Sequence, residues 1–287
     1  MRSIEFSVPG GSLHALRFGD GAKTALAAHG ITASAMSFRA VARQLPEDWS
    51  LVAVDLRGRG GSAGLPGPYG MDAHAADLAA VAEQLGAPVA LTGQSMGAYA
   101  ALRAAVQRPE LFSRLVLVDG GLPLPVPAQF DADQLLELTI GPAVARLRET
   151  YPSVDAYLAF FQAHPALAGE WNDDMAEYVR YDATGEPGAI RSRTGSEAVY
   201  ADGRDLLVNG SAFGDDLVKL ALPATLLYAP RGMFGQEPGM LPQPVVEHWA
   251  ARAPQLRAEL VSDTNHYTIL MTDRPAALIA ERLTGAA

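Results

Sequence analysis

The sequence contains no cysteine. This absence excludes disulfide bonds, metal sites built on thiolates and cysteine nucleophiles. Long apolar runs are also missing, since none approaches the ~18 residues that a membrane span needs. The first residues, MRSIEFSVPGG, hold no apolar segment of the kind found in secretory signals. We therefore expect a cytoplasmic protein with no membrane partner.

Basic residues are scarce relative to acidic ones. The chain has 22 Lys and Arg against 32 Asp and Glu, which gives a formal net charge of −10. An acidic chain repels nucleic acids and anionic membranes, so neither is an expected partner. No group of His, Asp and Glu residues has the spacing of metal ligands, so no metal is expected.

Short apolar runs alternate with helical patterns along most of the 287 residues. Four runs have the continuous apolar character of parallel strands buried on both faces: KTALAAHG, SLVAVDLRG, PVALTGQS and RLVLVDGG. Helical patterns cover residues 37–45, 71–85 and 95–107, and SIEFSV and SLHALRFG flank PGG as in a hairpin. This alternation predicts an α/β fold with a mostly parallel sheet and crossover helices.

The alternation breaks after Gly121. The proline-rich LPLPVPAQF opens a helical, aromatic stretch, and the strand pattern resumes with PATLLYAP and LRAELV before a last helix over 275–283. We therefore predict a core domain of residues 1–121 and 216–287, with a helical cap of residues 122–215 inserted between two strands.

The stretch LTGQSMGAYA places Ser95 between two glycines, directly after a strand pattern and before a helical one. A strand-to-helix turn this tight strains the backbone of its central residue, and side chains at positions 93 and 97 would clash. The turn presents the hydroxyl group at the carboxyl end of the sheet, beside a helix N-terminus. We interpret Ser95 as a nucleophile rather than as a helix N-cap.

A serine at its ordinary pKa needs a base to become a nucleophile. Among the six histidines, His266 stands in the loop SDTNHYTIL after the apparent last strand, which ends at the same edge of the sheet as Ser95. His164 and His248 have the pattern of surface positions, and His74 lies in a helix with a polar face. We therefore predict His266 as the base.

The loop AAHGITAS follows an early strand and is expected to aim a backbone N–H at the reacting carbonyl. We predict that the N–H groups of Ile31 and Met96 form an oxyanion hole, which stabilises charge that appears only in the transition state. His29, in the same loop, is interpreted as structural.

Four motifs together resemble the α/β-hydrolase family: HG after an early strand, DLRGRGGS after the next, GQSMG, and a late NHY. The resemblance covers residues 1–121 and 216–287 and implies an eight-stranded sheet with flanking helices and a helical cap. It also implies a triad in the chain order Ser, acid, His. Ser95 and His266 match the first and last members.

The acid of that triad stays open. The family usually keeps it after the strand PATLLYAP, but RGMFGQEPGM stands there, with Arg231 and Gly232 in place of Asp and Glu237 several residues later. Other members of the family take the acid from the loop after the preceding core strand, where Asp119 lies. Asp119, Glu237, and an acid that is missing or replaced by water are the three alternatives, and Asp263 is too close to His266 in sequence.

Gly58, Gly60 and Ala63 fit a dinucleotide-binding fingerprint, but GLPGPYG follows and cannot form the helix that such a site needs. No cofactor is expected. Asp55 and Arg57, in the same loop, are interpreted as residues that order it.

Three aromatic residues of the cap, Phe160, Phe161 and Trp171, either line an acyl pocket or pack within the cap. Arg191 and Arg193 either meet an anionic substrate or are exposed arginines.

These residues predict a cofactor-independent serine hydrolase that cleaves a carboxylic ester or lactone through an acyl-enzyme on Ser95. The expected partner is a small, partly apolar substrate, and the oligomeric state is left open. One alternative is the same fold cleaving a C–C, thioester or amide bond. The other is a non-catalytic protein that binds a small ligand and has a degenerate acid position.

Overall fold

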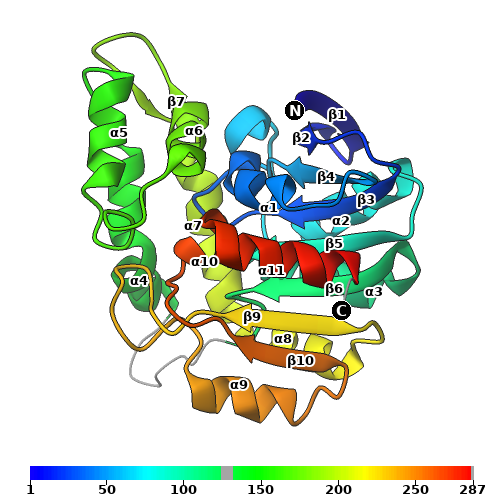
Figure 1. Cartoon of the computed structure of the whole chain (residues 1–287). Coiled ribbons are helices and arrows are strands. Elements are labelled where there is room, and N and C mark those ends of the chain that lie inside the picture. The colour runs from blue at the N-terminus through cyan, green and yellow to red at the C-terminus, as the bar shows by residue number, and fades with distance from the viewer. Residues whose placement is uncertain (124–131, 286–287) are drawn as a thin grey trace.

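The computed structural model describes residues 1–123 and 132–285. Its centre is a sheet of eight strands in the order β1-β2-β4-β3-β5-β6-β9-β10 (Figure 1). The strands are β1 (Arg2–Val8), β2 (Gly11–Phe18), β3 (Lys23–Ala28), β4 (Trp49–Val54), β5 (Val89–Gln94), β6 (Phe112–Val118), β9 (Ala224–Tyr228) and β10 (Leu256–Leu260). Only β2 runs against its neighbours β1 and β4, while the other pairs are parallel. The predicted hairpin and mostly parallel sheet are confirmed.

Helices cover both faces of the sheet (Figure 1). One face carries α1 (Arg39–Arg43), α10 (Thr268–Met271) and α11 (Asp273–Thr284); the other carries α2 (Met71–Gln84), α3 (Met96–Gln107), α8 (Gly210–Lys219) and α9 (Gln243–Ala250). Alternate residues of a strand point to opposite faces, so Leu26 and Ala28 of β3 join one apolar cluster and Ala25 and Ala27 the other. This is why the central strands are continuous apolar runs.

The predicted helices agree with the structure at α2, α3 and α11. The pattern over residues 37–45 corresponds to a short 3₁₀ turn, η1 (Ala35–Phe38), followed by α1. None of the helices in the described part of the chain is both long and apolar enough to cross a membrane.

Between β6 and β9 the chain forms α4 (Ala132–Leu147), α5 (Val154–Gln162), α6 (Asp173–Asp182), the short pair β7 (Ala183–Thr184) and β8 (Arg191–Ser192), and α7 (Ser196–Val208). These elements lie beyond the carboxyl ends of the parallel strands (Figure 1). Tyr157, Val179 and Ile190 belong to an apolar cluster of their own, whereas Phe213 and Leu217 of α8 join the cluster of the core. The division into core and cap at residues 122–215 stays a prediction.

Candidate active site

Ser95 stands alone between β5 and α3, with φ of 53° and ψ of −123°. A Cβ on Gly97 would lie 2.1 Å from the carbonyl oxygen of Ala28, and one on Gly93 would lie 2.1 Å from that of Gly97. These are impossible contacts, so the turn admits only glycine at both flanks. The predicted strained turn is present and holds the Ser95 hydroxyl at the end of the sheet.

His266, in the loop between β10 and α10, is buried beside this hydroxyl. Its Nε2 lies 3.1 Å from Ser95 Oγ, and its Nδ1 lies 2.6 Å from Asp119 Oδ2. Serine, histidine and carboxylate therefore form one hydrogen-bonded chain. With Nδ1–H donating to the carboxylate, Nε2 faces the serine as an acceptor.

Asp119 is the first residue after β6 and is 2% exposed. Its φ of 45° turns the chain sharply away from the strand, a conformation that Asp tolerates better than most residues. The Ala229 N–H, just after β9, donates to Asp119 Oδ1 over 3.1 Å. One carboxylate oxygen is thus held by a backbone N–H group, and the other accepts a hydrogen bond from His266.

The other candidate acids lie elsewhere. Glu237 is exposed and shows no contact with His266 among the described residues. Arg231, at the position where the family usually has its acid, donates to the backbone carbonyls of Thr264 and Asp263 over 3.3 and 2.9 Å. The Asp263 side chain is 88% exposed. Arg231 therefore supports the loop that carries His266. Among the candidate acids, Asp119 is the one that contacts His266.

Two amide side chains near His266 escaped the sequence analysis. Gln94 Nε2 donates to the His266 carbonyl over 3.1 Å. Asn265 Oδ1 accepts from the N–H groups of Tyr267 and Thr268, and its Nδ2 donates to the Ala166 carbonyl over 2.8 Å. Gln94 belongs to the motif GQSMG and Asn265 to the motif NHY. The sequence gives no sign that these amides hold the histidine loop, because nothing in either motif indicates their hydrogen-bond partners.

The loop after β3 places Ile31 at the mouth of the site, where it lines the same cavity as Ser95. Neither Ile31 N–H nor Met96 N–H has an acceptor among the described residues. An oxyanion hole requires two such unbonded donors, and the assignment of these two N–H groups to it stays a prediction.

His29 is fully buried and orders this loop. Its Nε2 accepts from the Leu56 N–H over 3.0 Å, so its Nδ1–H donates to the Gly30 carbonyl over 2.7 Å. Burial lowers the pKa of His29 to about 4, against a smaller raising effect of Asp55. The ring is neutral at pH 7 and acts as a structural bridge.

The His29 pKa predicts acid sensitivity. The unfolded chain binds a proton at about pH 6.5 and the folded chain only near pH 4, so stability is full above pH 6.5 and falls as the pH drops between these values. We expect this group to remove about 3 kcal/mol from the free energy of unfolding between pH 7.5 and 4. His29→Gln should abolish that part of the slope in urea titrations.

The matched control is His248→Gln, which makes the same substitution at an exposed position of α9. A His29→Gln profile as steep as that of the wild type would contradict the assignment.

A buried ion cluster ties α7 to the loop after β3 that carries Ile31, called the oxyanion loop here after its predicted role. Asp202 pairs with Arg59, lies 3.0 Å from His74 Nε2 and accepts from the Gly70 N–H over 2.6 Å. Arg59 Nε in turn donates to the Ile31 carbonyl over 3.0 Å. Burial acts to raise the pKa of Asp202, but the charges of His74 and Arg59 outweigh it and lower the pKa to about 2. His74 is thus completely buried, although its helix has a polar face.

Asp202→Ala should destabilise the fold by about 3–5 kcal/mol, because it leaves the Arg59 guanidinium buried without its carboxylate. Urea unfolding followed by circular dichroism measures this loss. Glu197→Ala, at an exposed position of α7, is the control and should change stability by about 0.5 kcal/mol at most. An Asp202→Ala loss as small as that of the control would contradict the role of the cluster.

A cavity of about 300 Å³ opens in front of Ser95 and His266. Phe160, Phe161 and Trp171 all line it, Phe160 from the rim at 42% exposure. Phe161 and Trp171 also pack in apolar clusters, so both interpretations of these residues describe the same side chains.

Other cap residues differ from expectation. His164 lines the cavity and is half-buried, so its interpretation as a surface residue was wrong. Arg193 lies over the ring of Tyr181 at 5.6 Å, and neither it nor Arg191 lines the cavity. Among the described residues that line the cavity, the one cationic side chain is Arg146, which the sequence analysis missed.

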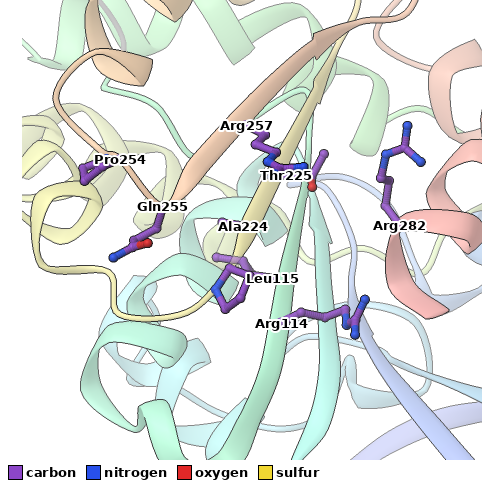
Figure 2. A pocket seen from close by; sticks show the side chains of 9 residues that line it. Arg114, Leu115, Ala224, Thr225, Pro254, Gln255, Arg257 and Arg282 are labelled. Carbon is purple, nitrogen blue, oxygen red and sulfur yellow. The ribbon is translucent and has the colours of Figure 1, made fainter. Parts of the chain in front are cut away.

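A second cavity, of about 400 Å³, lies at the starts of β6, β9 and β10, at the opposite end of the strands (Figure 2). Arg114, Arg257 and Arg282 line it, and Arg282 is paired with Glu259 and Glu281. None of the predicted site residues lines this cavity.

The loop after β4 lacks the helix start of a dinucleotide site, since the next α-helix begins at Met71. Asp55 accepts there from the N–H groups of Ala35 and Gly61, and Arg57 pairs with Asp77, as expected of residues that order a loop. Within residues 1–123 and 132–285 no three His, Asp or Glu side chains form a group that would hold a metal ion.

A model of the alpha/beta hydrolase family matches residues 25–282 of the chain. The curated N-formylmaleamate deformylase of Pseudomonas putida is 38% identical over 136 residues, which are 45% of this chain and 51% of that protein. The chain spans about half of the length of the curated relatives that it matches, or less.

Among solved structures, E-2-(acetamidomethylene)succinate hydrolase superposes with a TM-score of 0.80 at 19% identity, over 99% of this chain and 100% of that one. A thermophilic esterase from Thermogutta terrifontis gives a TM-score of 0.71 at 22% identity, over 99% of both chains. At such identities the likeness concerns the fold alone. This fold agrees with the eight-stranded sheet that the resemblance to the family implied.

Proposed function

Because the chain belongs to the alpha/beta hydrolase family, we propose that it is a cofactor-independent serine hydrolase that cleaves a carboxylic ester or lactone. The observation that carries the proposal is the hydrogen-bonded chain from Ser95 Oγ through His266 to Asp119. A nucleophile, a base and a group that orients the base are the three parts that acyl transfer to serine requires.

In the first half of the reaction, Ser95 Oγ attacks the carbonyl carbon of the substrate while His266 Nε2, 3.1 Å away, accepts the hydroxyl proton. The carbonyl oxygen becomes an oxyanion that accepts from the N–H groups of Ile31 and Met96. His266 then gives its proton to the leaving oxygen, so the ester C–O bond breaks and an acyl group stays on Ser95.

In the second half, His266 removes a proton from a water molecule, and the resulting hydroxide attacks the acyl carbon. The same two N–H groups stabilise the second oxyanion. Return of the proton to Ser95 Oγ releases the carboxylic acid and restores the starting state. Asp119 accepts from His266 Nδ1 in both halves and stabilises the imidazolium form of His266.

The cavity supports a substrate that is at least partly apolar. Phe160, Phe161 and Trp171 supply aromatic surface next to the nucleophile, and Leu167 and Met175 add aliphatic surface. Apolar walls strengthen the electrostatic interactions at the reacting carbonyl, because water is excluded there.

Amide cleavage is a second candidate, favoured by the 38% identity to a relative named for removing an N-formyl group. The chemistry is the same except that His266 must protonate a nitrogen leaving group. A 4-nitrophenyl ester and the 4-nitroanilide of the same acid separate the two, since both release a chromophore. Because the ester is intrinsically far more reactive than the anilide, turnover of the anilide supports the second candidate, and turnover of the ester alone supports the first.

The proposal is tested with a fluorophosphonate probe, which reacts only with an activated serine. We expect one adduct per chain by intact mass, and peptide mapping should locate it at Ser95 among the 14 serines. A chain that stays unlabelled and turns over no ester or amide would overturn the proposal. It would favour a non-catalytic protein that binds a small ligand in the cavity.

A further inference from the structure

Arg146, on α4, is the only described residue of the Ser95 cavity that carries a permanent charge. Its side chain is 13% exposed, in a cavity walled mainly by aromatic and aliphatic groups. The other basic group outside the hydrogen-bonded chain is His164, whose pKa is lowered by burial and by the Arg146 charge. At neutral pH the wall therefore presents one cation.

The hydrogen bonds of Arg146 leave part of the guanidinium unused. Nη1 donates to Tyr157 Oη over 2.8 Å, and that hydroxyl donates to Asp182 Oδ2 over 2.6 Å. Arg146 Nη1 lies 3.9 Å from the same carboxylate oxygen, too far for a direct hydrogen bond. Nε and Nη2 have no acceptor among the described residues and stay accessible to solvent.

Asp182 does not satisfy these donors. One of its oxygens accepts from Tyr157 and the other from Ser192 Oγ over 2.9 Å, and the carboxylate is 1% exposed. The guanidinium is held in place over the ring of Phe161, at 5.1 Å. An arginine fixed on an aromatic face, with two donor nitrogens that have no acceptor among the described residues, is suited to a planar anion that accepts two hydrogen bonds.

The geometry points to Arg146 as a specificity-determining residue that binds a carboxylate group of the substrate. The natural substrates are then anionic acyl compounds, such as monoesters or monoamides of dicarboxylic acids. This inference rests on the proposed function, because it takes Ser95 as the reacting centre of the same cavity.

The test compares pairs of 4-nitrophenyl esters. One member is a monoester of adipic or pimelic acid, and the other carries an isopropyl group in place of the free carboxylate. We expect the wild type to favour the anionic member in kcat/KM, and Arg146→Met to reduce that ratio by about 10- to 100-fold, mostly through KM. Arg146→Lys should retain part of the preference.

Arg193→Met is the matched control. Arg193 also lies between β6 and β9, but it is exposed and does not line the cavity. It should keep the wild-type ratio. Equal kcat/KM for both esters in the wild type, or an unchanged ratio in Arg146→Met, would overturn the inference while ester turnover upholds the proposed function.

Binding to a chain that cannot react keeps the two proposals apart. In the Ser95→Ala variant, calorimetry with the intact esters should give a Kd at least about 10-fold lower for the anionic member, and adding Arg146→Met should remove the difference. Equal Kd values for the two esters would overturn the carboxylate site. This readout does not depend on whether Ser95 forms an acyl-enzyme.

Discussion

Ser95→Ala is expected to lower kcat for ester hydrolysis by roughly 10⁶-fold and to leave the fold intact. Without the hydroxyl no acyl-enzyme forms, and only the oxyanion donors and binding in the cavity remain to accelerate direct attack by water. The only hydrogen bond of Ser95 Oγ in the described structure is the one to His266, so little stability is lost. Absorbance assays with 4-nitrophenyl esters measure kcat, and a thermal melting curve measures stability.

Ser34→Ala is the matched control for this experiment. Ser34 is buried in the oxyanion loop, but its hydroxyl has no partner among the described residues and does not line the cavity. The control should therefore keep the wild-type kcat. A Ser95→Ala variant that retains more than a few per cent of the wild-type rate would show that another group is the nucleophile.

The serine turn was predictable because all its determinants are local. Gly93 and Gly97 lie within two residues of Ser95, and the strand and helix patterns on either side fix the direction of the chain. The strands were predictable for a related reason, since burial on both faces leaves a continuous apolar run in the sequence.

The acid was not predictable in the same way. Asp119 and His266 are 147 residues apart, and their contact depends on β6 and β10 lying on either side of β9 in one sheet. The sequence favours Asp119 but leaves Glu237 and a missing or water-replaced acid as alternatives until the order of the strands is known. Arg231 then explains the departure from the usual pattern, because it supports the histidine loop through backbone carbonyls.

Lone polar residues inside helices gave the weakest predictions. His74 and Asp202 are completely buried because the Asp202 carboxylate pairs with Arg59 and also contacts His74 Nε2, and no periodic pattern reports such a partnership. Arg146 escaped notice because a single arginine in an amphipathic segment looks like an exposed one until the cavity is seen.

The second large effect is expected at Asp119. Asp119→Asn should lower kcat by about 10⁴-fold, because an amide no longer requires the His266 tautomer with Nδ1–H and does not stabilise the imidazolium. Stability should change little, since the asparagine carbonyl can still accept from the Ala229 N–H. Ester kinetics and the rate of fluorophosphonate labelling should fall together.

Glu237→Gln makes the same chemical change at an exposed position and should keep the wild-type rate. The pair of variants separates the three alternatives left by the sequence. A loss in Glu237→Gln with activity retained in Asp119→Asn would mean that the loop after β9 moves and delivers the acid during turnover. Activity retained in both would mean that water or backbone orients His266, and the 2.6 Å contact to Asp119 would then serve the fold alone.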